Sequence, residues 1–463
     1  MMKILLVKPN VSSDTVIPPL GLGYIAKRVT EKNKVKILDC LKDNISQARF
    51  ERYISDYRPD ILGIQVYNTD KGLSRQYLKI VKHIDKRTIT VIGGPYPSCE
   101  PEGVFDFFGS CLDFAFCGEA EKGFCQLVSA VSDKQSLMSD DIAGLIYRKK
   151  SKVKINKSYS PDTCASIGYP DWDLLKPEIY PPSPVGAFLR SYPSAPIVIS
   201  RGCPYKCSFC AGWRITGDKV RYRTIDNVIA EIKLLSGKHG IREFHILDDN
   251  FTFNRDYVTD FCRSVINAGI NAKFACPNGI RIDTIDEEVL KLMKKAGFYS
   301  IHIGIESGSQ KILNYMGKIQ TLNMIRDRIK KIKKIGMEVC AYFIIGYPGE
   351  TSKDIKNTLK LAMSLPIDRS MFMNFLPIPG TAIHNELEKK HDCNMRTSDK
   401  RSFYKVNYTS DMIPSWRVKY FQIKSMLVFY MRPKILVRNL AAVYSIRHLF
   451  YIIRRVIRIV ISV

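Results

Sequence analysis

The chain has 463 residues, which is too long for one ordinary hydrophobic core, so we expect two or three domains. Its 45% hydrophobic and 25% charged residues are typical of a folded globular protein and argue against a disordered chain. The net charge of +26 suggests an anionic partner, such as nucleic acid, an acidic membrane surface or a phosphate-bearing ligand, but charge alone selects none of these.

Cysteine usage and the N-terminus indicate a reducing compartment. The 13 cysteines are scattered and odd in number. No signal peptide precedes them, because the first residues, MMKILLVKPN, run directly into an apolar, strand-like segment. Metal binding or burial explains such thiols better than disulfides do. We therefore expect a cytoplasmic protein.

Strands alternating with helices predict a first domain over residues 1–140, with a doubly wound, Rossmann-like parallel sheet. The strands are predicted from apolar runs at 3–8, 35–39, 61–67 and 88–95, and helices from stretches such as 21–29 and 73–84. A ligand should bind at the carboxyl ends of these strands, where glycines let the backbone approach it closely. The candidate binding residues there, which could instead be ordinary turn residues, are Asn68, Thr69, Gly93, Gly94, Pro95, Gly118 and Glu119.

A connector is predicted over residues 141–194, with a hairpin over 142–158 and a Pro-rich, loop-like stretch after it. The second domain, over 195–390, contains six strand-like runs with helical patterns between them. Six strands are fewer than the eight of a closed (β/α)8 barrel, so an open, partial (β/α)6 barrel is expected. The six runs are 195–200, 242–250, 272–281, 300–308, 338–350 and 370–381.

The last region, 391–463, is predicted to be helical and basic. Residues 401–463 contain 12 Lys and Arg but one acidic residue, Asp411, and no window is long and uncharged enough to span a bilayer. The apolar, Arg-containing segment 443–463 predicts either an interfacial helix on an anionic membrane or a helix docked on the second domain. Aromatic residues of this region are expected to cover the open end of the barrel, namely Trp416, Tyr420, Phe421, Phe429 and Tyr430.

The stretch VISRGCPYKCSFC, residues 198–210, carries the strongest chemical signal. Its cysteines, Cys203, Cys207 and Cys210, are spaced CxxxCxxC. Three thiolates cannot complete the tetrahedral sulfur shell of a structural zinc site. They can hold three irons of a cubane cluster and leave the fourth iron open for a ligand. Merely buried or zinc-bound thiols are the alternative.

A partial barrel whose first strand ends in CxxxCxxC resembles the radical S-adenosylmethionine (SAM) enzymes, over about residues 195–385. The resemblance implies that the three cysteines ligate a [4Fe–4S] cluster, that SAM binds its open iron, and that one electron cleaves the sulfonium to a 5′-deoxyadenosyl radical. It also implies an electron donor such as flavodoxin or ferredoxin.

The same resemblance implies SAM-binding roles for strand-end residues and for the segment 343–350, which occupies the place of an adenine-contact motif. Single strand-end carboxylates could instead be structural. The implied residues are Phe209 near the adenine, Asp248, Asp249 and Asn250 near the amino group, Arg281 at the carboxylate and Glu306 at the ribose.

The N-terminal domain, with PPLGLGYIA, VIGGPYPS and DFAFCGEAEKGF, resembles the cobalamin-binding domain that precedes the radical domain in a large subgroup. The DxHxxG loop that supplies a histidine to cobalt is missing, since the first predicted strand is followed by PNVSSDTVIPPLGLG. The resemblance therefore implies base-off cobalamin without a protein histidine. A decayed domain that serves only as a lid is the rival interpretation.

Cobalamin beside a radical SAM centre implies methyl transfer to an unactivated carbon of a small-molecule or lipid-like substrate. Ring formation, rearrangement or oxidation are alternatives within the family. Two further alternatives come from other classes: an RNA-modifying methylthiotransferase, and a non-catalytic lipid-surface or scaffold protein. Nucleic acid is the less favoured partner, because the region after the barrel is helical and no second cysteine triplet is evident among Cys40, Cys99, Cys111, Cys117 and Cys125. We expect the protein in the cytoplasm, with peripheral contact at the inner face of the membrane as an added expectation.

Overall fold

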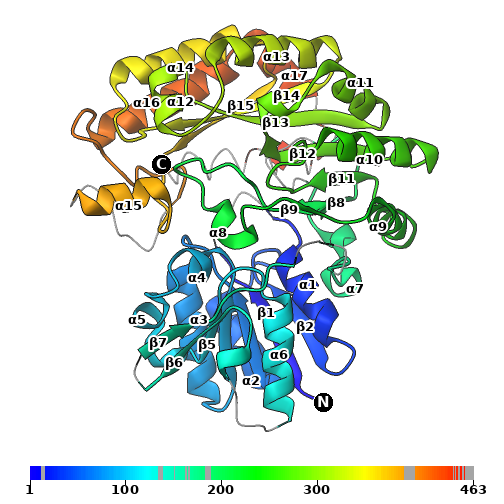
Figure 1. Ribbon diagram of the computed structural model, residues 1–463, viewed down its shortest axis with the longest axis vertical. Helices are drawn as coiled ribbons and strands as arrows, with labels where there is room; N and C mark the ends of the chain where they lie inside the picture. Colours follow the sequence, from blue (N-terminus) through cyan, green and yellow to red (C-terminus); the bar gives the residue numbers. More distant parts are fainter. Residues whose placement is uncertain are drawn as a thin grey trace.

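The computed structural model shows two α/β domains, one above the other in Figure 1, with the helix α8 (Gly212–Thr216) between them. The first domain lies at the bottom of the view and the second, with the C-terminal helices, at the top. The structure describes residues 1–11, 16–133, 139–150, 152–161, 164, 167–182, 189–390, 402–441, 443, 445, 446, 449, 450 and 453.

The first domain is built on a seven-stranded sheet with the strand order β2-β1-β3-β4-β5-β6-β7. The first five strands are parallel and confirm the predicted Rossmann-like arrangement. The strands β6 and β7 form the predicted hairpin, in which β6 pairs antiparallel to β5 and β7 pairs antiparallel to β6. The sheet thus extends beyond residue 140, where the first domain was predicted to end. The strands are β1 Lys3–Lys8, β2 Lys34–Asp39, β3 Ile61–Gln65, β4 Ile89–Gly93, β5 Phe114–Phe116, β6 Leu145–Lys149 and β7 Lys152–Ile155.

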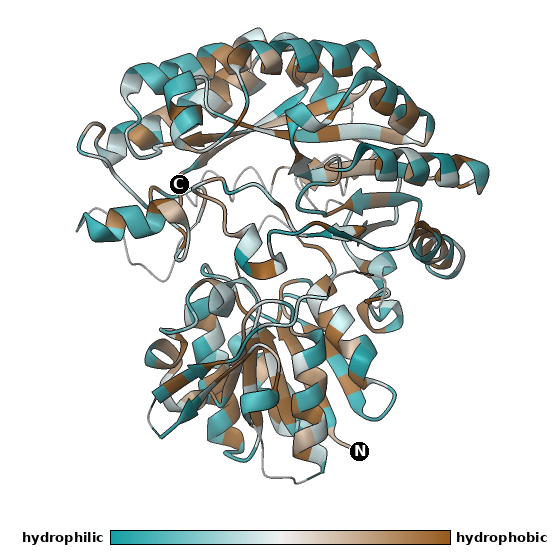
Figure 2. Cartoon of the chain, in the orientation of Figure 1, coloured by the Kyte–Doolittle hydropathy of each residue, from teal (hydrophilic) through white to brown (hydrophobic). Residues whose placement is uncertain are grey.

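Helices cover both faces of this sheet, which explains why its strands are continuous apolar runs rather than alternating ones. In β1, Leu5 and Val7 enter the core beneath α2 and α3, while Ile4 and Leu6 enter the core beneath α1 and α6. Figure 2 shows the hydrophobic residues gathered along these strands. The helices of this domain are α1 Leu20–Val29, α2 Gln47–Tyr57, α3 Lys71–Ile84, α4 Pro95–Cys99, α5 Val104–Phe108 and α6 Glu121–Ser132.

The second domain contains the six parallel strands that the sequence predicts, in the sequential order β8-β11-β12-β13-β14-β15 of an open partial barrel. The connector reaches it through α7 (Trp172–Leu175), where the Trp172 indole donates a hydrogen bond to the buried Glu231 of α9 (Ile225–Lys238). The strands are β8 Ser194–Ile197, β11 Glu243–Ile246, β12 Lys273–Ile280, β13 Phe298–Glu306, β14 Glu338–Ile345 and β15 Arg369–Asn374, and a short hairpin adds β9 Ser200–Arg201 and β10 Arg221–Tyr222.

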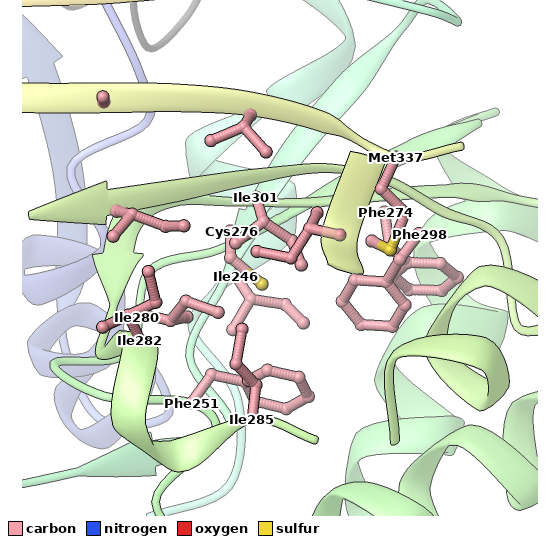
Figure 3. Close-up of a cluster of buried hydrophobic side chains, with 14 of the residues drawn as sticks. Ile246, Phe251, Phe274, Cys276, Ile280, Ile282, Ile285, Phe298, Ile301 and Met337 are labelled. Atoms are coloured by element: carbon pink, nitrogen blue, oxygen red, sulfur yellow. The ribbon is translucent and has the colours of Figure 1, made fainter. Parts of the chain in front are cut away.

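The two faces of the barrel strands differ in chemistry. In β13, Ile301, Ile303 and Ile305 belong to the main hydrophobic core, part of which Figure 3 shows. The alternate residues Ser300 and His302 lie on the opposite face, because side chains alternate along a strand. The helices around the sheet are α9 Ile225–Lys238, α10 Arg255–Asn267, α11 Glu287–Lys295, α12 Gln310–Tyr315, α13 Leu322–Lys334 and α14 Ser352–Ser364.

Three described helices follow the barrel: α15 Ala382–Lys389, α16 Ser415–Tyr430 and α17 Pro433–Ala441. Phe421 and Phe429 of α16 pack in the main core, and the Tyr430 hydroxyl donates to the carbonyl of Ser370 in β15. The expectation that these aromatic side chains cover the open end of the barrel is therefore wrong for these three, because they are engaged at the side of the edge strand. The segment 443–463, predicted as an interfacial helix, lies almost entirely outside the described residues. Within the described part of the chain, no helix has the length and apolar character needed to span a membrane.

Candidate active site

The cysteine loop follows β9 and is held by contacts from three later segments. Ser208 donates its backbone N–H to the carbonyl of Met316 after α12, and its hydroxyl lies 2.7 Å from the Tyr347 hydroxyl after β14. Its carbonyl accepts a hydrogen bond from the Ile383 N–H of α15. These bonds tie the loop to the carboxyl ends of the barrel strands, where the ligands of a partial barrel are expected.

The three thiols fit a cubane cluster better than a single metal ion. Cys203 and Cys207 are half-buried and Cys210 is exposed, so ligand atoms can reach a group placed outside the loop. Among the described residues, no three His, Cys, Asp or Glu side chains converge as ligands of one ion. A cubane distributes its thiolates over separate irons, so its ligands need not meet at one point. Burial raises the pKa of the Cys203 thiol, and cluster binding would have to displace its proton.

Asp248 and Asp249, which follow β11, support the cysteine loop and the strand before it. The Asp248 carboxylate accepts from the backbone N–H of Ile199 at 2.7 Å and of Ser200 at 2.8 Å. Burial nevertheless raises its pKa to about 7. Asp249 accepts from the Gly202 N–H at 3.2 Å. Both carboxylates thus hold the chain at the cysteine loop, and a direct contact with SAM stays a prediction.

Arg281, at the end of β12, lies beside the cysteine loop. Its guanidinium is 3.6 Å from the centre of the Tyr205 ring, and it forms two hydrogen bonds to Asp283, at 3.0 and 2.8 Å. The Nη1 atom is buried and has no hydrogen-bond partner among the residues that the structure describes. The buried Asn250 amide nitrogen is likewise without one. Unsatisfied donors beside the cluster loop fit the acceptor groups of a bound ligand.

Glu306 ends β13 in an unusual backbone conformation. Its φ of +66° is in the left-handed region, which costs a residue with a Cβ free energy and is found preferentially at functional sites. The carboxylate is 3.0 Å from the Lys318 ammonium, which also donates to the carbonyl of Gly304. A Cβ on Gly304 would lie only 2.3 Å from Glu306 Oε1. The Glu306 carboxylate can therefore occupy this position only because residue 304 is a glycine and has no side chain.

The predicted adenine-contact segment, 343–350, forms a turn after β14. Buried Glu350 accepts hydrogen bonds from the N–H groups of Gly346 at 2.7 Å and Tyr347 at 3.3 Å. The Tyr347 ring meets Phe209 edge-on, with centroids 6.5 Å apart. Val418 of α16 supports the turn from outside, since a Cβ on Gly346 would lie 3.0 Å from it. The structure thus brings Phe209 and this segment together.

Glu350 should make stability depend on pH. Burial raises its pKa to about 8 from an ordinary 4.5, so the folded state keeps a proton that the unfolded state releases between these values. Stability should therefore fall as pH rises from about 4.5 to about 8, by about 4 kcal/mol at most. Glu350→Gln should remove this contribution and make the dependence of stability on pH shallower, which urea unfolding at pH 5, 6.5 and 8 would measure. A smaller slope of the same sign should remain, because burial also raises the pKa of Asp248. An unchanged slope in the variant would show that Glu350 is ionised in the fold.

A cavity of about 260 Å³ lies where the carboxyl ends of the first sheet face the second domain. Of the predicted N-terminal residues, it is lined by Gly93, Gly94, Pro95, Gly118 and Glu119, whereas Asn68 and Thr69 do not line it. A Cβ on Gly93 would meet no atom of the described part of the chain within 4 Å, so this glycine leaves open space at the cavity wall. No histidine lines the cavity within the described residues, as the missing motif implies.

The opposite wall of the cavity belongs to the second domain. Arg201, two residues before Cys203, contributes to it, as do Ile215 and Thr216 of α8, directly after the cysteine loop. A molecule in the cavity would therefore contact the segments that flank the three cysteines. This adjacency of a Rossmann-type ligand site and a cluster loop is the central feature of the candidate site.

Four charged residues with largely buried side chains join the two domains beside this cavity, and we call them the interdomain clamp: Glu119, Glu121, Arg201 and Arg221. Arg201 is 3.2 Å from Glu119 and 2.8 Å from Glu121, while Arg221 forms a two-pronged ion pair with Glu119, one bond of which is 3.2 Å long. Burial acts to lower the pKa of Arg201, but the two glutamates raise it above its ordinary value. Glu119, predicted to bind cobalamin, is thus engaged with two arginines.

Sequence reasoning missed Arg201, Arg221 and Lys318, because basic residues are frequent in this chain and nothing in the sequence shows which carboxylate each one pairs with. It also missed Asn278, whose amide donates to the carbonyls of Leu247 at 3.2 Å and Asp248 at 3.0 Å. The motif CPNGIR was a usable signal, since an asparagine beside a glycine at a strand end often serves to bridge loops.

Comparisons with known proteins agree with this geometry. Residues 197–362 match the model of the radical SAM superfamily, and residues 9–128 match that of the B12 binding domain. The chain is 32% identical over 99% of its length to an uncharacterized methyltransferase from Pyrococcus horikoshii, of which it covers 98%. It is 28% identical over 85% of its length to cytidylyl-2-hydroxyethylphosphonate methyltransferase from Streptomyces wedmorensis, of which it covers 82%.

Among solved structures, the cobalamin-dependent SAM radical enzyme OxsB superposes with a TM-score of 0.75 at 19% identity, covering 99% of this chain and 72% of that one. This likeness shows the shared two-domain fold. The two family models assign the chain a [4Fe–4S] cluster, SAM and cobalamin as cofactors. The chain therefore belongs to the radical SAM superfamily, among the members that carry a B12-binding domain before the radical SAM domain.

Proposed function

We propose that the protein is a cobalamin-dependent radical SAM methyltransferase that methylates an unactivated carbon of a small-molecule or lipid-like substrate. The observation that carries the proposal is the shared cavity wall: the ligand site of the B12-binding domain opens onto Arg201, Ile215 and Thr216, which flank the cysteine loop. Two relatives that are named methyltransferases, each aligned over most of the chain, support the same reaction class.

The residues of this chain divide the work as follows. Cys203, Cys207 and Cys210 would hold the cluster, and the Gly212 N–H donates to Cys210 Sγ at 3.4 Å, which stabilises the thiolate form. Arg281 and Glu306 would orient SAM, the first through its unpartnered Nη1 and the second through its carboxylate. When bound, these cofactors supply radical chemistry and a methyl carrier, while the protein positions them and excludes water.

The reaction can be tested without knowing the substrate. Reconstituted, reduced protein loaded with cobalamin should be given SAM that carries a labelled methyl group. We expect label in the protein-bound cobalamin with one S-adenosylhomocysteine per label, and 5′-deoxyadenosine with methionine from reductive cleavage. Cleavage without label transfer would instead support ring formation, rearrangement or oxidation. Absence of both products would revive the non-catalytic alternative.

Gly93 offers a direct test of the cobalamin site. Gly93→Leu should lower cobalamin affinity by at least about tenfold, because its side chain would extend into cavity space that the protein leaves open. Titration of cob(II)alamin followed by electron paramagnetic resonance would measure this, and the spectrum should lack nitrogen superhyperfine splitting from a protein histidine. Gly237→Ala on α9 serves as the control, because a Cβ there would meet no described atom within 4 Å, and it should leave cobalamin binding unchanged. Gly109 is not suitable as a control, because its φ of +66° would strain any residue with a Cβ.

The RNA-modifying alternative is not favoured by the described residues. The described chain after the barrel is helical in α15, α16 and α17 rather than a small β-barrel. Cys40 and Cys111 are buried in the hydrophobic core of the first domain, so they do not supply a second cluster. The proposal also requires an external one-electron donor, such as flavodoxin or ferredoxin, and a cytoplasmic location.

A further inference from the structure

The helix α16 carries apolar side chains on two opposite faces. Its inner face packs against the barrel through Val418, Phe421 and Phe429. Gln422 on the same face donates to the carbonyl of Phe372 at 3.0 Å, which fixes the helix to β15. A surface helix of a globular protein normally carries one apolar stripe, with polar and charged residues on the opposite face. In α16, one of the two apolar faces is instead left without an apolar neighbour in the described structure.

The outer face of α16 is an exposed apolar stripe, which continues onto α17. Five of its residues, on α16 and directly after it, align along one side of the helix because they recur at spacings of three or four, namely Trp416, Tyr420, Ile423, Leu427 and Met431. Trp416 and Met431 are each 67% exposed and Leu427 is 58% exposed. We call the whole set the outer stripe: Trp416, Tyr420, Ile423, Leu427, Val428, Met431, Leu436, Val437 and Leu440.

Basic residues flank the outer stripe on both sides. On a helix of 3.6 residues per turn, Lys419 falls on one side of the stripe, and Arg417 and Lys424 fall on the other. Residues 412–463 contain no Asp or Glu. Long basic side chains beside an apolar stripe can lie with their stems on the apolar surface and their charges at a headgroup. Trp and Tyr are the side chains that favour a membrane–water boundary.

We infer that the outer stripe docks on an anionic lipid bilayer surface. Pairing with a second copy of the chain through the same face would place the flanking lysines and arginines of both copies against each other, which is unfavourable. The cores of protein interfaces are also depleted in lysine. An anionic bilayer instead satisfies the apolar stripe and the flanking charges together. This surface is separate from the candidate active site and does not rest on the proposed reaction.

The test is co-sedimentation of the full-length protein with vesicles of phosphatidylglycerol and phosphatidylcholine, and of phosphatidylcholine alone. We expect binding to the anionic vesicles, weaker binding at high salt because of screening, and little binding to the neutral ones. The triple variant Trp416→Ser, Leu427→Ser, Met431→Ser should bind at least about tenfold more weakly, as should Lys419→Glu with Lys424→Glu.

Matched controls keep the outcome specific. Ile179→Ser removes an exposed isoleucine in the connector, and Lys330→Glu with Lys334→Glu makes the same charge change on α13, so both should bind as the original protein does. Circular dichroism would show that each variant is folded. All variants keep residues 442–463, so unchanged binding by both α16 variants would overturn the inference. A dimer in light scattering that the triple variant loses would also overturn it, in favour of a second copy as the partner.

Discussion

Replacing Cys203, Cys207 or Cys210 by alanine should abolish the iron–sulfur centre of this protein. Anaerobically reconstituted protein is expected to hold roughly four irons per chain and to absorb broadly in the visible range. With one ligand lost, the cluster should be absent or unstable, and reductive SAM cleavage should fall below detection. Iron analysis, the visible spectrum and 5′-deoxyadenosine formation measure the three effects.

The core cysteines provide matched controls for this experiment. Cys262 and Cys276 lie in the main hydrophobic core, and Figure 3 shows Cys276 among apolar side chains. Their side chains are fully enclosed there, 0% and 1% exposed, so neither sulfur can reach a cluster held outside the cysteine loop. Their alanine variants should keep the cluster. If either variant lost it while a loop variant kept it, the ligand assignment would be wrong.

The interdomain clamp should have the second large effect. Arg221→Met leaves the buried Glu119 with only part of its ion pairing, and breaking a buried pair in this way costs about 3–5 kcal/mol. Three clamp residues line the interdomain cavity that we propose holds cobalamin, and one of them, Arg201, lies two residues before Cys203. Loss of the clamp should therefore also change the distance between the two proposed cofactor sites. Misplacement of reacting groups by 1 Å can cost about a hundredfold in rate.

A double variant separates positioning from stability. Glu119→Leu with Arg221→Met removes the charge on both sides and replaces it with apolar groups, so urea unfolding should show much of the lost stability restored. We expect this variant to cleave SAM reductively, which needs only the second domain, but to transfer labelled methyl to bound cobalamin about a hundredfold more slowly. Undiminished label transfer at equal cobalamin loading would exclude a positioning role.

A surface ion pair serves as the comparison for the clamp. Arg255 in α10 is half exposed and pairs with Asp286 at 2.7 Å. Exposed pairs contribute little to stability because solvent screens them. Arg255→Met should therefore leave both the unfolding curve and label transfer close to those of the original protein.

The sequence by itself determined the secondary structure and the fold class. The strands β1 and β13 could be predicted because their signal is local. A strand buried on both faces is a continuous apolar run, and a strand buried on one face alternates apolar and polar residues. The spacing of Cys203, Cys207 and Cys210 likewise predicts the cluster loop, since all three ligands lie within eight residues. The hairpin was also predicted, but its pairing with β5, which extends the first sheet, was not, because sheet edges are chosen by long-range contacts.

Only the tertiary structure decided how the predicted residues are used. Asp248 and Glu119 follow strands in their predicted places, but the fold engages the first with the backbone where β9 begins and the second with Arg201 and Arg221. The sequence also cannot tell which face of α16 is exposed as the outer stripe. Both faces of this helix carry apolar residues, and the fold buries only one of them. The partners of Asp248 and Glu119 lie tens to more than a hundred residues away in the sequence. The identity of a residue, whether a carboxylate or a leucine, does not determine which distant group it will contact in the fold.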